Sequence, residues 1–155
     1  MRSEFTNCNQ LLDRVKKRQD LITVKGIPRG TGHILLVDDE KVVLEITEEI
    51  LQDLGYTVTT RISGTEALKT FRENPGTFDL LITDLTMPEM NGKDLAAHVS
   101  EIRPGFPVIL CTGFSTEMAK EKYSPKAIQA YINKPILIQE LAKTIREVLD
   151  AEKAS

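Results

Sequence analysis

Apolar and polar positions alternate along most of this chain in blocks that predict strands and helices in turn. Short continuous apolar runs, typical of strands buried on both faces of a parallel sheet, lie at 34–37, 80–82 and 107–110. Two shorter patterns, at 56–60 and 129–133, complete a set of five expected strands. Because helical patterns separate these runs, we expect a parallel sheet with helices on both faces.

Apolar residues at helical spacing predict helices at 41–54, 63–73, 93–102 and 115–123, followed by a closing helix. The stripes expected to face the core are Val43, Ile46, Ile50 and Leu54 in the first helix and Leu137, Leu141, Ile145 and Val148 in the last. Ser63 and Glu66 have the spacing of a capping box. The helix at 115–123 has few apolar anchors, so we expect it to be the most mobile element.

Residues 1–32 differ in character from the rest. A short and mostly polar helix is predicted around Leu11, and Gly26, Pro28, Gly30 and Gly32 then give the stretch the composition of a linker. We therefore expect an N-terminal extension at 1–32, one domain at 33–150 and a tail at 151–155.

Composition narrows the class of protein. The chain has 155 residues, 41% hydrophobic and 28% charged, which suits one globular domain with a short appendage. The net charge of −3 gives no basic surface for nucleic acid or anionic lipid. No apolar run has the length of a membrane span or the pattern of a signal peptide, so we expect a cytoplasmic location without membrane contact. Cys8 and Cys111 are too far apart in sequence to indicate a disulfide or zinc framework.

Chemically active side chains follow four of the expected strands. Asp38 and Asp39, then Asp84, Thr112 and Lys134, each come at or just after a strand end. In open parallel sheets, ligands bind outside the carboxyl ends of the strands. Three carboxylates gathered there would repel one another unless a cation were present. Oxygen ligands without a placed histidine or cysteine favour Mg²⁺ over zinc.

The charge of such a pocket suits phosphoryl transfer. Three carboxylates and one lysine sum to −2, and a divalent cation would bring the pocket to about neutral. Asp84 could then act as a nucleophile and form an aspartyl phosphate, while Lys134 neutralises the phosphoryl oxygens. Thr112 offers a hydroxyl donor that could report the presence of the phosphate.

These residues resemble the receiver domain of two-component response regulators. The resemblance spans Gly32 to Asp150 and rests on the motifs Val37-Asp38-Asp39-Glu40, Thr83-Asp84-Leu85-Thr86-Met87-Pro88-Glu89-Met90-Asn91-Gly92, Thr112-Gly113 and Lys134-Pro135. It implies a flavodoxin-like (βα)5 fold with strand order 2-1-3-4-5. It also implies a phosphoacceptor signalling domain, rather than a turnover enzyme, with self-catalysed phosphotransfer and autodephosphorylation.

The resemblance further assigns roles by position. Phosphate would come from a histidine kinase or a histidine phosphotransfer protein to Asp84. Mg²⁺ would be held by Asp39, Asp84 and the Thr86 carbonyl, with Asp38 acting through water. The roles that remain are phosphoryl binding by Lys134, Thr112 and Gly113, switching by Thr112 and Tyr131, and a cis peptide bond before Pro135. A downstream protein would bind through the last strand and the last two helices.

Several alternatives stay open at this stage. We expect no output domain after Asp150, and this ending together with the glycine-containing stretch in front resembles the C-terminal receiver of a hybrid histidine kinase. A stand-alone regulator is the other interpretation. A Mg²⁺-dependent phosphohydrolase with an aspartate nucleophile is a different class, although those enzymes usually carry Asp-x-Asp where this chain has Asp38-Asp39. A receiver-like interaction module that is never phosphorylated is the third.

Overall fold

The computed structural model describes residues 27–113 and 127–154, which contain a five-stranded parallel sheet and four helices. In sheet order the strands are β2 (Thr57–Arg61), β1 (His33–Val37), β3 (Leu80–Asp84), β4 (Val108–Thr112) and β5 (Ala130–Asn133). The described helices are α2 (Lys41–Asp53), α3 (Gly64–Glu73), α4 (Gly92–Ile102) and α6 (Ile138–Ala154). The expected strand order is confirmed, while the helix expected at 115–123 lies outside the described residues.

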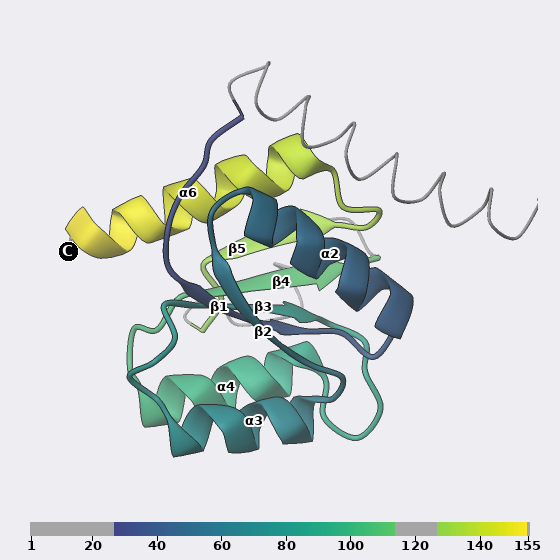
Figure 1. Ribbon diagram of the computed structural model, residues 1–155. Coiled ribbons are helices and arrows are strands. Elements are labelled where there is room, and N and C mark those ends of the chain that lie inside the picture. The colour runs from purple at the N-terminus through teal and green to yellow at the C-terminus, as the bar shows by residue number, and fades with distance from the viewer. Residues whose placement is uncertain (1–26, 114–126, 155) are drawn as a thin grey trace, which may run out of the picture.

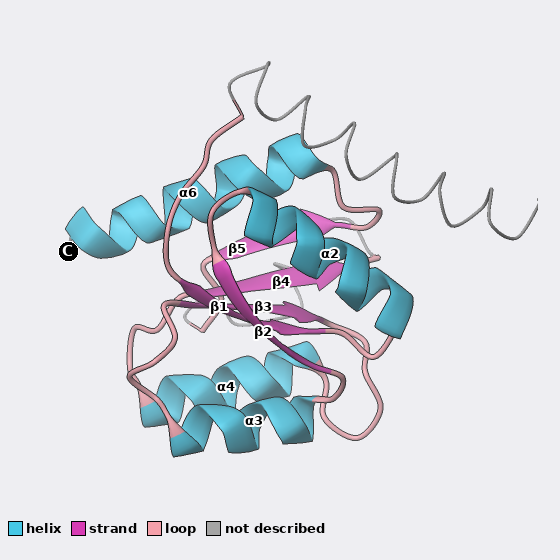
Figure 2. Ribbon diagram, in the orientation of Figure 1, coloured by secondary structure: helices cyan, strands magenta, loops and turns pink. Residues whose placement is uncertain are grey.

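Helices cover both faces of the sheet (Figure 1), with α2 and α6 on one side and α3 and α4 on the other (Figure 2). Alternate residues of the central strands therefore supply two cores: in β1, Ile34 and Leu36 pack with α2 and α6, whereas Leu35 and Val37 pack with α3 and α4. This double burial is why the strand sequences are continuous apolar runs.

Two of the predicted apolar stripes differ from the structure. Leu137 precedes α6 and is 61% exposed, while Leu141, Ile145 and Val148 are buried as expected. The Leu137 carbonyl accepts the Leu141 N–H (2.9 Å), so Leu137 lies at the start of the helix and its side chain stays outside the packed stripe.

In α2 the buried side chains are Leu44, Thr47, Ile50 and Leu51, so the inward face is rotated from the predicted stripe. Of the predicted stripe, Ile50 and Leu54 are buried as expected, Ile46 is half-buried against the core, and Val43 is half-buried. The buried face includes a threonine, and a polar residue at a core position interrupts the apolar spacing from which the stripe was predicted. Thr47 is tolerated there because its hydroxyl donates to the Val43 carbonyl (2.8 Å).

Residues 151–154, expected to form a tail, continue α6. They contain no helix breaker, and alanine, glutamate and lysine are good helix formers.

Among the described helices, none combines the length and the apolar character needed to cross a lipid bilayer. The sheet and its four helices thus place the carboxyl ends of all five strands along one edge.

Candidate functional site

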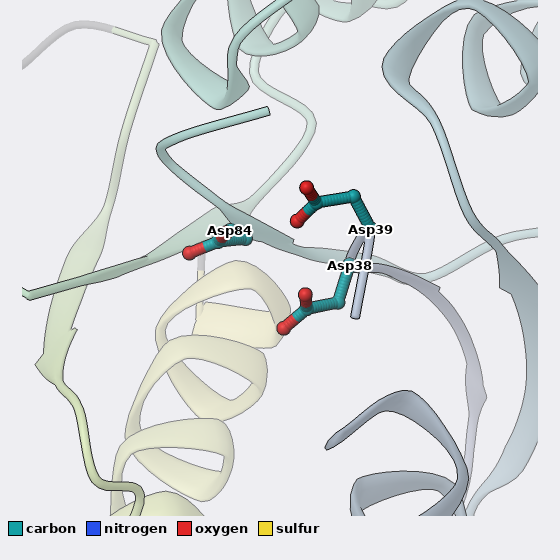
Figure 3. A group of neighbouring side chains, drawn as sticks. All are labelled: Asp38, Asp39 and Asp84. Carbon is teal, nitrogen blue, oxygen red and sulfur yellow. The ribbon is translucent and has the colours of Figure 1, made fainter. Parts of the chain in front are cut away.

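Three carboxylates meet where β1 and β3 end (Figure 3). The two strands run side by side with Val37 opposite Thr83, so the residues that follow them, Asp38 and Asp84, are brought to the same place. One oxygen from each of Asp38, Asp39 and Asp84 lies within 4.8 Å of the others. Asp38 and Asp84 are buried, at 5% and 8% exposure, whereas Asp39 is exposed.

Lys134, directly after β5, supplies the positive charge. Its Nζ lies 3.0 Å from Asp84 Oδ1 and 3.1 Å from Asp38 Oδ2, so one ammonium group bridges both buried carboxylates. The Lys134 backbone N–H also donates to the Thr112 carbonyl (2.8 Å), which extends the pairing of β4 and β5 by one residue. The expected cis peptide bond between Lys134 and Pro135 is present.

The pKa values of Asp84 and Lys134 reflect opposing effects of burial and of neighbouring charges. Burial raises the pKa of Asp84, Lys134 opposes that rise, and the charges of Asp38 and Asp39 add to it. Burial alone would lower the pKa of Lys134, but its hydrogen bonds to Asp84 and Asp38 outweigh that effect and leave the pKa raised. Lys134 therefore stays protonated, and the cluster keeps more negative charge than this lysine can neutralise.

The loop after Asp84 folds back onto the strand end. The Gly92 N–H donates to the Leu85 carbonyl (2.8 Å), and a Cβ on Gly92 would overlap the Asp84 carbonyl oxygen. Asn91 then starts α4, because its side chain accepts the Asp94 N–H (2.8 Å) as an N-cap. Within the same loop Glu89 has φ 66°, the left-handed region that favours glycine. Sequence reasoning identified the Asn91-Gly92 turn but not this close contact with Asp84.

The remaining predicted site residues lie on or next to the neighbouring strands. Thr112 is buried at the end of β4, and Gly113 after it is exposed, with open space where a Cβ would be. Tyr131 is half-buried in β5, opposite Leu110, and packs against the core beneath α3 and α4. The Thr86 side chain is exposed in the loop after β3.

Cys111 lies next to this cluster, as the neighbour of Asp84 across the β3 and β4 pairing. It is 3% exposed, and its carbonyl accepts the Leu85 N–H (2.8 Å). Burial raises the pKa of its thiol to about 12. The sequence-based interpretation of Cys111 as a small packed hydrophobic residue agrees with this environment.

The donor set fits a hard divalent cation. Asp38, Asp39 and Asp84 offer only carboxylate oxygens, which Mg²⁺ prefers, and the described residues around them add no histidine or thiolate ligand. Three negative charges against the single charge of Lys134 leave a net charge of −2, which matches the charge of one such ion. Since Asp39 is exposed, an ion could keep part of its water shell there.

The sequence model of the response regulator receiver domain matches residues 34–146. This chain belongs to that family. As a receiver domain it is a module of two-component signalling, and receiver domains of this family bind Mg²⁺ at such an acidic pocket and interact with histidine kinases or phosphotransfer proteins and with downstream effectors.

Among its curated relatives is the sensor kinase CckA of Brucella abortus, 31% identical over 139 residues. That match covers 90% of this chain and 14% of the kinase. The transcriptional regulatory protein GlrR of Escherichia coli is 33% identical over 119 residues, covering 77% of this chain and 26% of the regulator. The chain thus spans about a quarter or less of the length of these relatives.

Solved structures agree with the fold. A response regulator receiver domain protein from Methanospirillum hungatei superposes with a TM-score of 0.71 at 34% identity, covering 81% of this chain and all of that one. The response regulator TrrA of Thermotoga maritima, solved with Mg²⁺ and BeF, gives 0.68 at 33% identity, covering 76% and 97%. The receiver domain of the hybrid histidine kinase CckA gives 0.65 at 33% identity, covering 76% and 99%.

Proposed function

We propose that this receiver domain accepts a phosphoryl group from phosphohistidine onto Asp84 and uses the phosphate to switch a protein-binding surface. The observation that carries the proposal is the position of the Asp84 carboxylate, buried at a strand end and 3.0 Å from the Lys134 ammonium group. Asp38 and Asp39, with oxygens within 4.8 Å, add the charge that a cation would offset.

These positions support the following transfer step. A carboxylate oxygen of Asp84 attacks phosphorus, the N–P bond of phosphohistidine breaks, and its electron pair stays on the imidazole nitrogen. Lys134, already 3.0 Å from Asp84, can neutralise charge on the incoming phosphoryl oxygens. Thr112 and the Gly113 backbone lie on the neighbouring strand end and would bind the phosphoryl group from that side.

Mg²⁺ bound by Asp39, Asp84 and the Thr86 carbonyl, with Asp38 acting through water, would supply positive charge to the phosphoryl group and relieve the repulsion among the carboxylates. We propose that the phosphate is later lost by hydrolysis, which the same ion would assist, so the domain is a phosphoacceptor with self-dephosphorylation rather than a turnover enzyme. Of these ligands, the described carboxylates are already gathered at one point.

Switching would start at Thr112 and Tyr131. Thr112 ends β4 and Tyr131 lies in β5, so a change at the phosphate has a short path into the last strand. We propose that β5, α6 and the segment at 115–123, outside the described residues, form the surface for a downstream protein. The donor would be a histidine kinase or histidine phosphotransfer protein, with a cytoplasmic location and no contact with nucleic acid or membrane.

We propose that the chain is the receiver part of a hybrid kinase, with a stand-alone regulator as the alternative. The similarity to the sensor kinase CckA of Brucella abortus, which covers 90% of this chain, supports the first context. The similarity to response regulators, which reaches the same length of 139 residues, supports the second.

Acetyl phosphate with Mg²⁺ tests the proposal. Intact-mass measurement should show one phosphoryl adduct that base removes, and Asp84→Ala should show none. Asp94→Ala, which removes an exposed carboxylate in the first turn of α4, is the matched control and should be phosphorylated normally. Continuous phosphate release over many turnovers would favour a phosphohydrolase instead. Absence of any adduct in the unaltered protein would favour an inert interaction module.

A further inference from the structure

The chain in front of β1 is fastened to the domain by backbone hydrogen bonds. The Gly30 N–H donates to the Leu54 carbonyl (2.9 Å), and the Gly32 carbonyl accepts the Thr57 N–H (2.8 Å). Ile27 packs against the core that α2 and α6 share with the sheet. The described part of the stretch predicted as a linker, residues 27–32, is therefore seated on the domain along its length.

Glycines allow the close contact between residues 27–32 and the turn after α2, because they have no side chain there. A Cβ on Gly55 would overlap the Gly30 carbonyl oxygen, and a Cβ on Gly30 would overlap the Tyr56 hydroxyl. Gly55 also has φ 109°, which other residues rarely adopt. The glycine content of this region thus serves close backbone contact, where the sequence pattern alone suggested flexibility.

Arg146 connects residues 27–32 to α6. Its guanidinium donates to the Arg29 carbonyl (2.8 Å) and forms an ion pair with Asp150 (3.6 Å) on the next turn of the helix. Burial raises the pKa of Tyr56, and the Arg146 charge opposes that rise, so the guanidinium also lies near the phenol. Figure 1 shows the segment before β1 (purple) passing across α6 on its way to β1, and the Arg146 hydrogen bond to Arg29 places the two in contact.

The other end of α6 is tied to the phosphorylation site. Only three residues separate Lys134, which contacts Asp84, from Ile138 at the start of α6. Arg146 lies eight residues further on, about 12 Å along the helix axis at 1.5 Å per residue. Between them Leu141 and Ile145 are fully buried in the core, so the two ends of the helix are joined by a packed element that could pass a shift from one end to the other.

We propose that residues 27–32, Tyr56 and Arg146 form a clamp that passes a shift of α6 to the chain in front of residue 27. Phosphorylation of Asp84 changes what Lys134 contacts, α6 shifts with the loop that Lys134 begins, and Arg146 carries the shift to the Arg29 carbonyl. The clamp therefore reports phosphorylation on the N-terminal side of the domain, in addition to the surface proposed for a downstream partner. This inference rests on the proposed function, since Asp84 has to accept the phosphate.

Hydrogen exchange on the full chain tests the clamp. Amide exchange of the peptide containing Gly30 is measured with and without acetyl phosphate and Mg²⁺, and intact mass records the adduct in the same samples. We expect phosphorylation to change the exchange rate at 27–32 by roughly threefold, the size expected for loss or gain of one exposed hydrogen bond.

Arg146→Ala should exchange roughly threefold faster at 27–32 before phosphorylation and lose the response to it, with an unchanged yield of adduct. Arg146→Lys, which keeps a donor, should restore part of the response. The control is Lys143→Ala, on the same helix, whose exposed side chain pairs with Glu147 at 3.9 Å; it should respond like the unaltered chain.

The outcomes separate the two proposals. An adduct without any change at 27–32 overturns the clamp and leaves the phosphoacceptor function intact. An adduct with the full change still present in Arg146→Ala removes Arg146 from the path and also overturns the clamp. Absence of an adduct in the unaltered protein overturns the proposed function and the clamp with it.

Discussion

The two ends of the sheet differ in the interactions that hold the neighbouring segments in place. At the carboxyl end, three carboxylates and Lys134 are crowded into one pocket whose charges do not balance. At the amino end, residues 27–32 contact the turn between α2 and β2 through backbone hydrogen bonds, and glycines without side chains leave room for this contact. Repulsion among the carboxylates is thus concentrated at the end where a bound cation can relieve it. The contacts at the amino end involve uncharged backbone groups and need no ligand.

Both ends also depend on a glycine with no space for a methyl group. A Cβ on Gly92 would overlap the Asp84 carbonyl at the first end, and a Cβ on Gly55 would overlap the Gly30 carbonyl at the second. Substitutions at these two positions therefore disturb one end at a time and can show whether stability and phosphorylation separate.

The largest effect is expected for Gly92→Ala. The added methyl group would also lie 2.7 Å from Leu110 Cδ1, in the core, so the strand end and the start of α4 have to move apart. We expect the free energy of unfolding to fall by about 3 kcal/mol and phosphorylation of Asp84 to slow strongly. Urea unfolding and the rate of adduct formation measure the two effects.

Gly113→Ala is the control at the same end of the sheet. A Cβ there meets nothing within 4 Å, so stability should change by less than about 0.5 kcal/mol. Equal losses in Gly92→Ala and Gly113→Ala would show that the close contact at Asp84 is not what limits substitution.

Next in size is the loss of Mg²⁺ binding in Asp39→Ala. A ligand that binds only the folded state stabilises it by about 2.7 kcal/mol at 100 times its Kd, and this gain should vanish when Asp39 is removed. Thermal unfolding with and without Mg²⁺ measures the gain. Because Asp39 is exposed, the metal-free variant should fold.

Glu40→Ala provides the comparison for Asp39→Ala. Glu40 is the adjacent exposed carboxylate, and its side chain makes no capping hydrogen bond at the start of α2. It should keep the full Mg²⁺ stabilisation. If Asp39→Ala keeps it as well, the metal is held in some other way and the proposed ligand set is wrong.

Gly55→Ala should separate the two ends of the sheet. The left-handed backbone and the contact with Gly30 together should cost about 2 kcal/mol of stability. Phosphorylation of Asp84 should keep its normal rate, since the substitution lies at the opposite end of the sheet. Gly76→Ala, where a Cβ meets nothing within 4 Å, should leave both quantities unchanged. A slowed phosphorylation in Gly55→Ala would show that the amino end affects the phosphotransfer step itself, in addition to the response to phosphorylation proposed for residues 27–32.

The smallest effect is expected for Tyr56→Phe, and its sign is opposite. The Tyr56 hydroxyl is buried and has no hydrogen-bond partner among residues 27–113 and 127–154, which is a cost to the folded state. Removing it should raise the free energy of unfolding by about 1 kcal/mol. Chemical denaturation measures the change, and Tyr56→Leu, which also loses the ring, should destabilise instead. A loss of stability in Tyr56→Phe would show that the hydroxyl has a partner in solution.

Much of the carboxyl end could be predicted from the sequence. Apolar runs that end in Asp38, Asp84 and Thr112 locate the strand ends, and parallel strands bring such ends to one edge. The charge pattern also predicted a phosphoryl-neutralising role for Lys134, and the family resemblance added the cis bond at Pro135. The bridging of Asp38 by Lys134 was not foreseen, because ion pairs between distant segments leave no periodic pattern in the sequence.

The amino end could not be predicted, for a physical reason. Its contacts join backbone groups, such as the Gly30 N–H and the Leu54 carbonyl, and backbone groups are the same in every residue. Glycine is common both in flexible linkers and in tight contacts, so composition cannot separate the two. The exposed Leu137 was misplaced for a related reason, since apolar spacing does not mark the residue at which a helix starts.

The surroundings of Cys111 have a consequence for the chemistry of the whole pocket. Oxidants attack thiolates, and a thiol with a pKa of about 12 that is 3% exposed offers almost none at neutral pH. Peroxide or disulfide exchange should therefore leave Cys111 unmodified, so the phosphate proposed for Asp84 would not be disturbed by oxidation of this neighbouring residue.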